Sequence, residues 1–88
     1  MNILVTGSNG FVGSRLMWEL EKLNHKVIGI DISSHCDAKP HPETVIGDIR
    51  SSKDLEKVQD IFYQKYNRPI KLIIHCAASK HDFGISRE

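Results

Sequence analysis

The segment Thr-Gly-Ser-Asn-Gly-Phe-Val-Gly occupies residues 6–13 and separates two stretches with different hydrophobic patterns. Before it, residues 2–6 form a short, nearly all-apolar run, as expected for a central parallel strand that is covered on both faces. After it, residues 14–23 have the spacing of an amphipathic helix. A second apolar run, residues 27–30, lies in an expected second strand over residues 26–30 and is followed directly by Asp31. Strand, glycine-rich turn, helix, strand and acid is the order of a dinucleotide-binding βαβ unit.

Each glycine of this segment has an expected role at a phosphate-binding turn. Gly7 would permit the tight turn, Gly10 would let the backbone approach a pyrophosphate, and Gly13 would let the helix pack on the strand. The first helical turn offers unpaired N–H groups and the positive end of the helix dipole. Asp31, 18 residues after Gly13, could accept hydrogen bonds from ribose hydroxyls. The alternative is that these are ordinary turn glycines and a strand-end carboxylate.

The composition excludes several classes of protein. With 12 basic and 11 acidic residues and a net charge of +1, the chain has no electrostatic reason to bind nucleic acid or an anionic membrane. No apolar run approaches the roughly 18 residues of a membrane span, and no signal-peptide pattern is present. We therefore expect a cytoplasmic protein whose two cysteines are reduced thiols. Residues 1–88 can form at most one small domain.

The remaining segments continue the alternation of strands and helices. Residues 32–42 have the composition of a loop, residues 43–47 of a short third strand, and residues 71–75 of a fourth strand. Between the last two, residues 52–66 form an amphipathic helix that ends before Pro69. The loop holds His35, Cys36 and Asp37 in a row, with His41 nearby, but no recognised set of metal ligands. We therefore expect a solvated loop and no metal site.

The first helix has a leucine-rich stripe. Val12, Leu16, Leu20 and Leu23 recur at spacings of four, four and three, so we expect this face to cover the sheet. The neighbouring residues 17 and 18, a methionine and a tryptophan, are expected to pack against a missing or partner element.

The glycine spacing in residues 6–13 is Gly-x-x-Gly-x-x-Gly, which resembles the T-G-x-x-G-F-[IV]-G fingerprint of the extended short-chain dehydrogenase/reductases. These are the NAD-dependent epimerases and dehydratases, many of which act on nucleotide sugars. Residues 47–50 (Gly-Asp-Ile-Arg) and 75–78 (His-Cys-Ala-Ala) are also similar to family motifs. The resemblance implies an α/β partial Rossmann fold: a parallel sheet of about four strands, order 3-2-1-4, with helices on both faces. It covers all of 1–88 but only the N-terminal part of the family's domain, so we expect a truncated half domain.

The resemblance also implies a site for the ADP part of NAD. Asp48 would accept from the adenine amino group while Ile49 packs on the ring, although Asp48 could equally be a helix-capping or turn carboxylate. The loop after Asp31 would border the adenine ribose, and it carries no immediate Arg for a 2′-phosphate, so NAD is favoured over NADP. The expected cofactor-binding residues are Gly7, Ser8, Asn9, Gly10, Phe11, Val12, Gly13, Asp31, Ile32, Ser33, Asp48, Ile49, Ala77 and Ala78.

The family's catalytic Tyr-x-x-x-Lys pair is not found. Neither Tyr63 nor Tyr66 has a lysine four residues later, so we assign no catalytic residue and expect the chain to be inactive alone. The first hypothesis is an NAD-binding N-terminal portion of an epimerase or dehydratase. The alternative is a stand-alone nucleotide-binding or interaction module that pairs with another chain or with a second copy.

Overall fold

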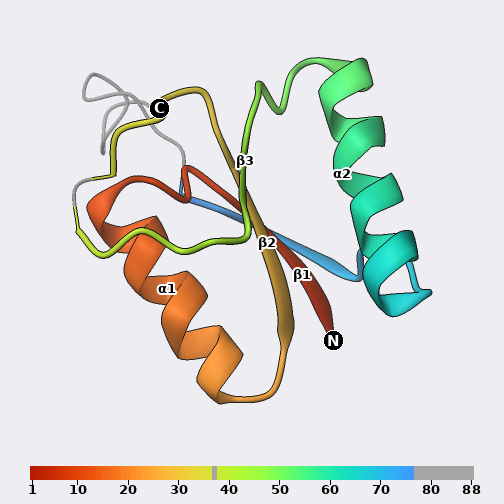
Figure 1. Cartoon of the computed structure of the whole chain (residues 1–88), viewed down its shortest axis with the longest axis horizontal. Coiled ribbons are helices and arrows are strands. Elements are labelled where there is room, and N and C mark those ends of the chain that lie inside the picture. Colours follow the sequence, from red (N-terminus) through yellow and green to blue (C-terminus); the bar gives the residue numbers. More distant parts are fainter. Residues whose placement is uncertain (37, 77–88) are drawn as a thin grey trace, which may run out of the picture.

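A computed structural model of the chain describes residues 1–36 and 38–76. The elements in chain order are β1 (Asn2–Thr6), α1 (Phe11–Lys22), β2 (Lys26–Asp31), β3 (Thr44–Ile46), α2 (Ser52–Tyr66) and β4 (Leu72–His75). All three strand pairs are parallel, and the strand order is β3-β2-β1-β4 (Figure 1). The predicted α/β architecture and the strand order 3-2-1-4 are therefore confirmed.

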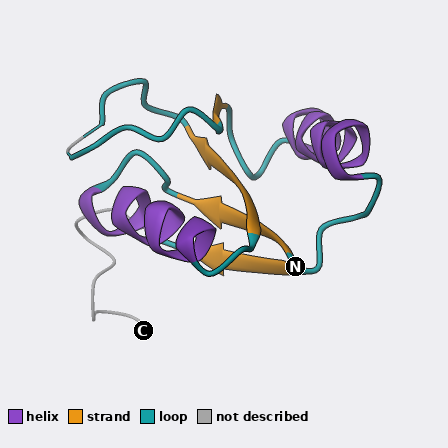
Figure 2. Ribbon diagram, turned by 60° about the horizontal axis from the view of Figure 1, so that its bottom comes forward, coloured by secondary structure: helices purple, strands orange, loops and turns teal. Residues whose placement is uncertain are grey.

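The two helices cover opposite faces of the sheet (Figures 1 and 2). Successive side chains of a strand point to opposite faces, and β1 shows this directly. Ile3 and Val5 pack in one buried cluster with Met17 of α1, whereas Leu4 packs in a second cluster with Phe62 of α2. The apolar run at residues 3–5 of β1 is thus explained by burial on both sides.

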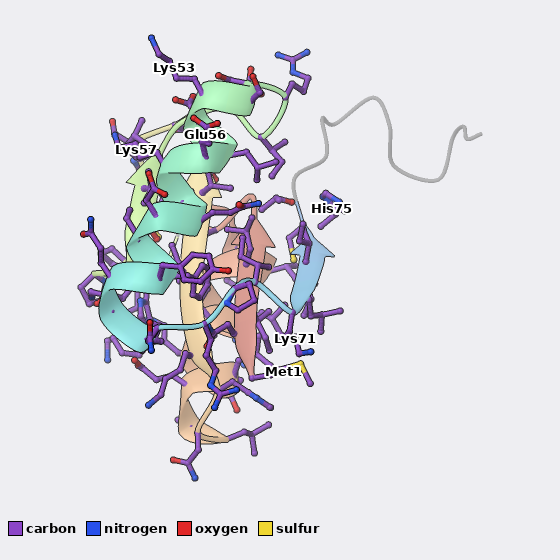
Figure 3. All side chains as sticks on the ribbon, turned by 90° about the vertical axis from the view of Figure 1, so that its right-hand side faces the viewer. Met1, Lys53, Glu56, Lys57, Lys71 and His75 are labelled. Atoms are coloured by element: carbon purple, nitrogen blue, oxygen red, sulfur yellow. The ribbon has the colours of Figure 1, made fainter. Side chains whose placement is uncertain are left out.

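Helix α2 follows its sequence pattern closely. Ser51 caps its N-terminus by accepting a hydrogen bond from the backbone N–H of Asp54 at 3.3 Å, and Asn67 ends it in a left-handed conformation. The apolar face expected from the sequence packs on the core, while Lys53, Glu56 and Lys57 lie on the outer face (Figure 3). Among the described residues, no helix is long and apolar enough to cross a membrane.

The predicted leucine stripe of α1 is confirmed only in its middle. Leu16 and Leu20 are partly buried against the core, whereas Val12 and Leu23 are 66% and 67% exposed. The buried positions of α1 include Gly13 and Met17. The physical reason is that α1 lies very close to the strands near its N-terminus, where only a small residue fits. Met17 then fills the space between α1 and the sheet, so the prediction that it packs against a missing element was wrong.

Because Phe62 is a large and fully buried side chain in the cluster between α2 and the sheet, its removal should leave a cavity. We expect Phe62→Ala to lower the free energy of unfolding by about 3–5 kcal/mol, measured by urea denaturation followed by circular dichroism. The matched control is Tyr63→Ala, because Tyr63 is the next residue of the same helix and is half exposed. Equal losses in the two variants would contradict the assigned core.

Candidate functional site

The residues expected to bind a cofactor lie where the strands end. All strands of a parallel sheet point the same way, so their carboxyl ends meet at one edge, the edge at which open α/β sheets bind ligands. Figure 2 shows that the strand arrows run in the same direction. The glycine-rich turn follows β1, Asp31 ends β2, and Asp48 follows β3. Ala77 and Ala78 lie outside the described residues, so their predicted role is left as a prediction.

The glycine-rich turn is held tightly against the start of α1. Gly7 has a φ of 69°, a conformation that favours glycine, and donates its N–H to Ile30 O at 2.9 Å. A Cβ atom on Gly13 would lie 2.1 Å from Gly7 O, whereas one on Gly10 would lie 3.3 Å from the same oxygen. Gly13 is therefore required for the close approach of the helix to the turn, and Gly10 has somewhat more room.

The N-terminus of α1 opens onto this turn. The first helical hydrogen bond runs from Ser14 N to Gly10 O at 3.0 Å. The N–H groups of Phe11, Val12 and Gly13 precede it and have no partner within the helix. No acidic residue occupies the first turn of α1, all of whose residues are described. The positive end of the helix dipole is therefore not neutralised by its own side chains, and it is available to an anion.

The side chains of Phe11 and Val12 do not enter the core. They are 58% and 66% exposed and line a shallow, largely apolar hollow of about 300 Å³ together with Arg15, Leu16 and Glu19. Any contact of these two residues with a phosphate would therefore come from their backbone N–H groups.

Asp31 connects two loops at the end of β2. Its Oδ2 accepts the backbone N–H of Asn9 at 2.9 Å, and its Oδ1 accepts the backbone N–H of Ser33 at 2.9 Å. The Asn9 side chain in turn donates to Ser33 O at 2.6 Å. The glycine-rich turn and the loop after β2 are therefore joined through one carboxylate. Ile32, which lies between Asp31 and Ser33 in the sequence, is 72% exposed.

A glycine that the sequence analysis did not single out is essential to this packing. A Cβ atom on Gly29, in the middle of β2, would lie 2.3 Å from Ser8 Cβ and 2.5 Å from Met17 Sδ. Ser8 is fully buried there, and its hydroxyl has no hydrogen-bond partner among the described residues. The structure thus gives the Ser8 side chain a packing position, and its contact with a cofactor stays a prediction. A glycine inside an apolar strand is the signal that could have revealed this close approach.

Asp48 forms a turn rather than a helix cap. Its Oδ1 accepts the backbone N–H of Arg50 at 2.9 Å, and its carboxylate also binds the Arg50 guanidinium at 3.1 and 2.9 Å. The capping residue of α2 is Ser51. The alternative to adenine binding, a helix-capping or turn carboxylate, is therefore met as a turn, and the contact with adenine stays a prediction. Hydrogen bonds from Arg50 lower the pKa of Asp48, which stays ionised. Ile49 packs partly against the α2 cluster, and its contact with a base is not tested.

The end of β4 lies beside the end of β1. Thr6 Oγ1 and His75 Nδ1 are 3.2 Å apart, and Cys76 donates its backbone N–H to Thr6 O at 3.0 Å. His75 is exposed at the end of β4. Burial raises the pKa of the Cys76 thiol, which disfavours the reactive thiolate.

The loop after β2 contains no metal centre in its described part. Among residues 1–36 and 38–76, no group of three or more His, Cys, Asp or Glu side chains is arranged to hold a metal ion. The loop is not simply solvated, however, because His41 is only 4% exposed.

A family model described as "NAD dependent epimerase/dehydratase family" matches residues 3–85. The chain belongs to this epimerase/dehydratase family. A 3-beta-hydroxysteroid dehydrogenase of Mycolicibacterium neoaurum is 41% identical over 54 residues, which are 60% of this chain and 15% of that protein. The crystal structure of dTDP-glucose 4,6-dehydratase from Bacillus anthracis, in complex with NAD, superposes with a TM-score of 0.63 and 29% identity. That match covers 90% of this chain and 27% of the dehydratase chain, so this epimerase/dehydratase family member spans about a quarter of its solved relative.

The contact at Gly13 yields a test of the turn. Because a Cβ on Gly13 would meet the backbone oxygen of Gly7, we expect Gly13→Ala to force the turn apart and to cost about 1–3 kcal/mol of stability. The control is Gly10→Ala, where the added atom stands farther from the same oxygen and the loss should be under about 1 kcal/mol. Thermal and urea unfolding measure both, and equal losses would contradict the close approach of α1 to the turn.

The Asp48–Arg50 pair yields a test by titration. Arg50→Gln should raise the pKa of Asp48 back toward the ordinary aspartate value, as measured by carbon-detected NMR titration of the carboxyl group. Since a lowered pKa favours the folded state only while the carboxylate is ionised, the contribution of this pair is present above the ordinary pKa. It is lost as the pH falls through the folded-state pKa.

The control for this titration is Arg68→Gln, which removes the same charge beyond the far end of α2 and should leave Asp48 unchanged. A pKa of Asp48 that does not respond to Arg50→Gln would show that the pair is not formed in solution.

Proposed function

We propose that this chain binds the ADP part of NAD at the carboxyl edge of its sheet, as the cofactor-binding portion of an epimerase or dehydratase. The observation that carries the proposal is the Asp31 carboxylate, which stands beside the turn that precedes a helix N-terminus. Membership of an NAD-dependent family, and a relative solved in complex with NAD, support a nicotinamide dinucleotide as the ligand.

The chemistry of the site fits this ligand. An ionised carboxylate offers about four lone-pair positions on two oxygens, and the N–H groups of Asn9 and Ser33 use one position on each oxygen. One position on each oxygen is left for the 2′- and 3′-hydroxyls of a ribose. The free N–H groups at the start of α1 provide donors for the pyrophosphate, and the absence of a side chain on Gly10 lets the phosphates approach.

The same carboxylate supports a preference for NAD over NADP. A 2′-phosphate replaces a hydrogen-bond donor by a group with a charge of nearly −2 at neutral pH, which Asp31 would repel. Ile32, the residue directly after it, brings no positive charge. The Arg50 guanidinium, in the Gly-Asp-Ile-Arg segment, is engaged by Asp48.

No catalytic role is proposed for a residue of this chain. Tyr63 and Tyr66 both lie on α2, on the opposite face of the sheet from α1, and neither belongs to a Tyr-x-x-x-Lys pair. When bound, NAD would supply hydride transfer; the residues assigned here bind and orient its ADP part.

A second candidate function is association with another chain or a second copy. The observation that favours it is β4, which forms one edge of the described sheet and leaves Leu72 and Ile73 43% and 40% exposed. Unpaired strand edges promote pairing between chains. Met17 cannot contribute to such an interface, because it is buried against the sheet.

The proposal is tested at Asp31. We expect Asp31→Asn to weaken binding of NAD and of ADP-ribose by about 10-fold or more, because a hydrogen bond to a charged group contributes about 1.5–3 kcal/mol. The asparagine amide would also present a donor to one of the two N–H groups now bound. NADP should bind the unmodified chain at least about tenfold more weakly than NAD, and this ratio should shrink in Asp31→Asn. Isothermal titration calorimetry measures all these affinities.

Asp60→Asn is the control, since Asp60 is an exposed carboxylate on α2 and its loss should leave NAD binding unchanged. An unmodified chain that binds neither NAD nor ADP-ribose would refute the proposed function. If the same sample sedimented as a dimer, the association function would take its place.

A further inference from the structure

The loop between β2 and β3 is fastened to α1 at a point distant from Asp31. Figure 1 shows this loop passing along α1 on its way to β3. Trp18 of α1 donates its indole N–H to Lys39 O at 3.1 Å, and the Lys39 ammonium lies 4.5 Å from the centre of the indole ring. The ring of His41 lies 4.4 Å from that of Trp18. We call Trp18, Lys39, His41 and Glu21 the clasp.

His41 is the buried centre of the clasp. Its side chain has no exposed surface, yet both ring nitrogens have partners: Nδ1 lies 3.1 Å from Glu43 N, and Nε2 lies 3.1 Å from Glu21 Oε1. A backbone N–H can only donate, so Nδ1 must be the acceptor. Nε2 then carries the ring hydrogen and donates a hydrogen bond to the Glu21 carboxylate. One side chain thus joins the end of the loop to the helix.

The other end of the same loop is fastened to the glycine-rich turn. Ser33 donates its N–H to Asp31, accepts from the Asn9 side chain at its carbonyl oxygen, and accepts the N–H of His35 at its hydroxyl, at 3.1 Å. The loop is therefore held at one end by the turn that precedes α1 and at the other end by the middle of α1. Because α1 is a rigid helix, the two attachments fix the described loop residues relative to the turn.

We propose that Trp18 and His41 are positioning residues for the dinucleotide site: through the clasp they hold residues 32–36 beside Asp31 and Asn9 before a ligand arrives. The inference rests on the proposed function for the identity of the ligand. A polar loop without such a fastening loses conformational freedom when a ligand orders it, and this loss weakens binding. A loop that is already fastened avoids that loss. The ligand class that benefits is an adenosine diphosphate group, since its ribose is the part that meets Asp31.

The first test needs no ligand. In the complete 88-residue chain, NMR hydrogen exchange of the Ser33 and Asn9 amides should become at least about fivefold faster in His41→Ala and in Trp18→Ala. The Leu4 amide, in the centre of the sheet, should exchange unchanged, which separates local release of the loop from a general loss of stability. The control is Lys22→Ala, on the exposed side of the same helix, with no expected effect on Ser33.

The second test measures affinity. ADP-ribose and NAD should both bind about 5- to 10-fold more weakly to His41→Ala and Trp18→Ala. Two conservative variants should recover part of the loss: Trp18→Phe keeps a ring beside His41, and His41→Asn keeps an acceptor for the Glu43 N–H. Trp18 is the only tryptophan of the chain, so its fluorescence in His41→Ala reports directly whether the clasp has opened.

The outcomes distinguish failure of the positioning role from failure of dinucleotide binding. Unchanged Ser33 exchange and unchanged affinity in His41→Ala would overturn the positioning role while leaving NAD binding by the unmodified chain intact. Ser33 exchange that rises only in step with Leu4 would also overturn it, since the clasp would then be a general stabilising contact. Faster Ser33 exchange in a chain that binds no ADP-ribose would refute the dinucleotide role in both proposals.

Discussion

The structure depends on two positions, Gly13 and Gly29, where the missing side chain of a glycine lets another part of the chain lie against the backbone. Gly13 presses α1 onto the carbonyl of Gly7, and Gly29 admits Ser8 and Met17 to the surface of β2. Protein interiors are packed as densely as organic crystals, so neither position can accept even a methyl group without movement of the backbone or of buried side chains. The consequence is a helix whose first N–H groups open directly onto the end of the first strand. Close packing at these glycines therefore creates the proposed phosphate site, and the charge of the helix N-terminus adds to it.

Asp31 adds electrostatics to this frame. A carboxylate at a strand end would repel its neighbours' carbonyl groups, but here it accepts two backbone N–H groups from loops on either side. These bonds keep it fixed in place while part of each oxygen remains free. The clasp on α1 also keeps the loop beside Asp31, because the loop that includes Ser33 cannot move far from this carboxylate while His41 stays buried. Turn, strand end and loop thus form one preorganised unit.

The fold was predictable from the sequence because these elements have distinct hydrophobic patterns. β1 and β2 contain continuous apolar runs, and α2 has an amphipathic stripe that the structure confirms. The buried face of α1 was predicted only in part, at Leu16 and Leu20. Leucines dominate a hydrophobicity pattern, while the fully buried Gly13 and Ser14 contribute almost nothing to it. His41 was mistaken for a solvated residue because its partners lie about twenty residues away on another element. The turn at Asp48 was among the alternatives. The cap is Ser51, which directly precedes the start predicted for this helix at residue 52, but an aspartate three residues earlier could serve the same role.

The parallel pairing of β1 with both β2 and β4 has a consequence for how this chain reaches its structure. β1 meets β2 after one helix, but the bond between Thr6 and His75 joins residues 69 positions apart. Contacts of long sequence separation require the closure of a long loop before they return any free energy, and they slow folding. The β1–α1–β2 unit can therefore assemble early, with one edge of its most apolar strand uncovered until α2 has formed and β4 docks. That interval is when the chain is most open to pairing with the wrong partner.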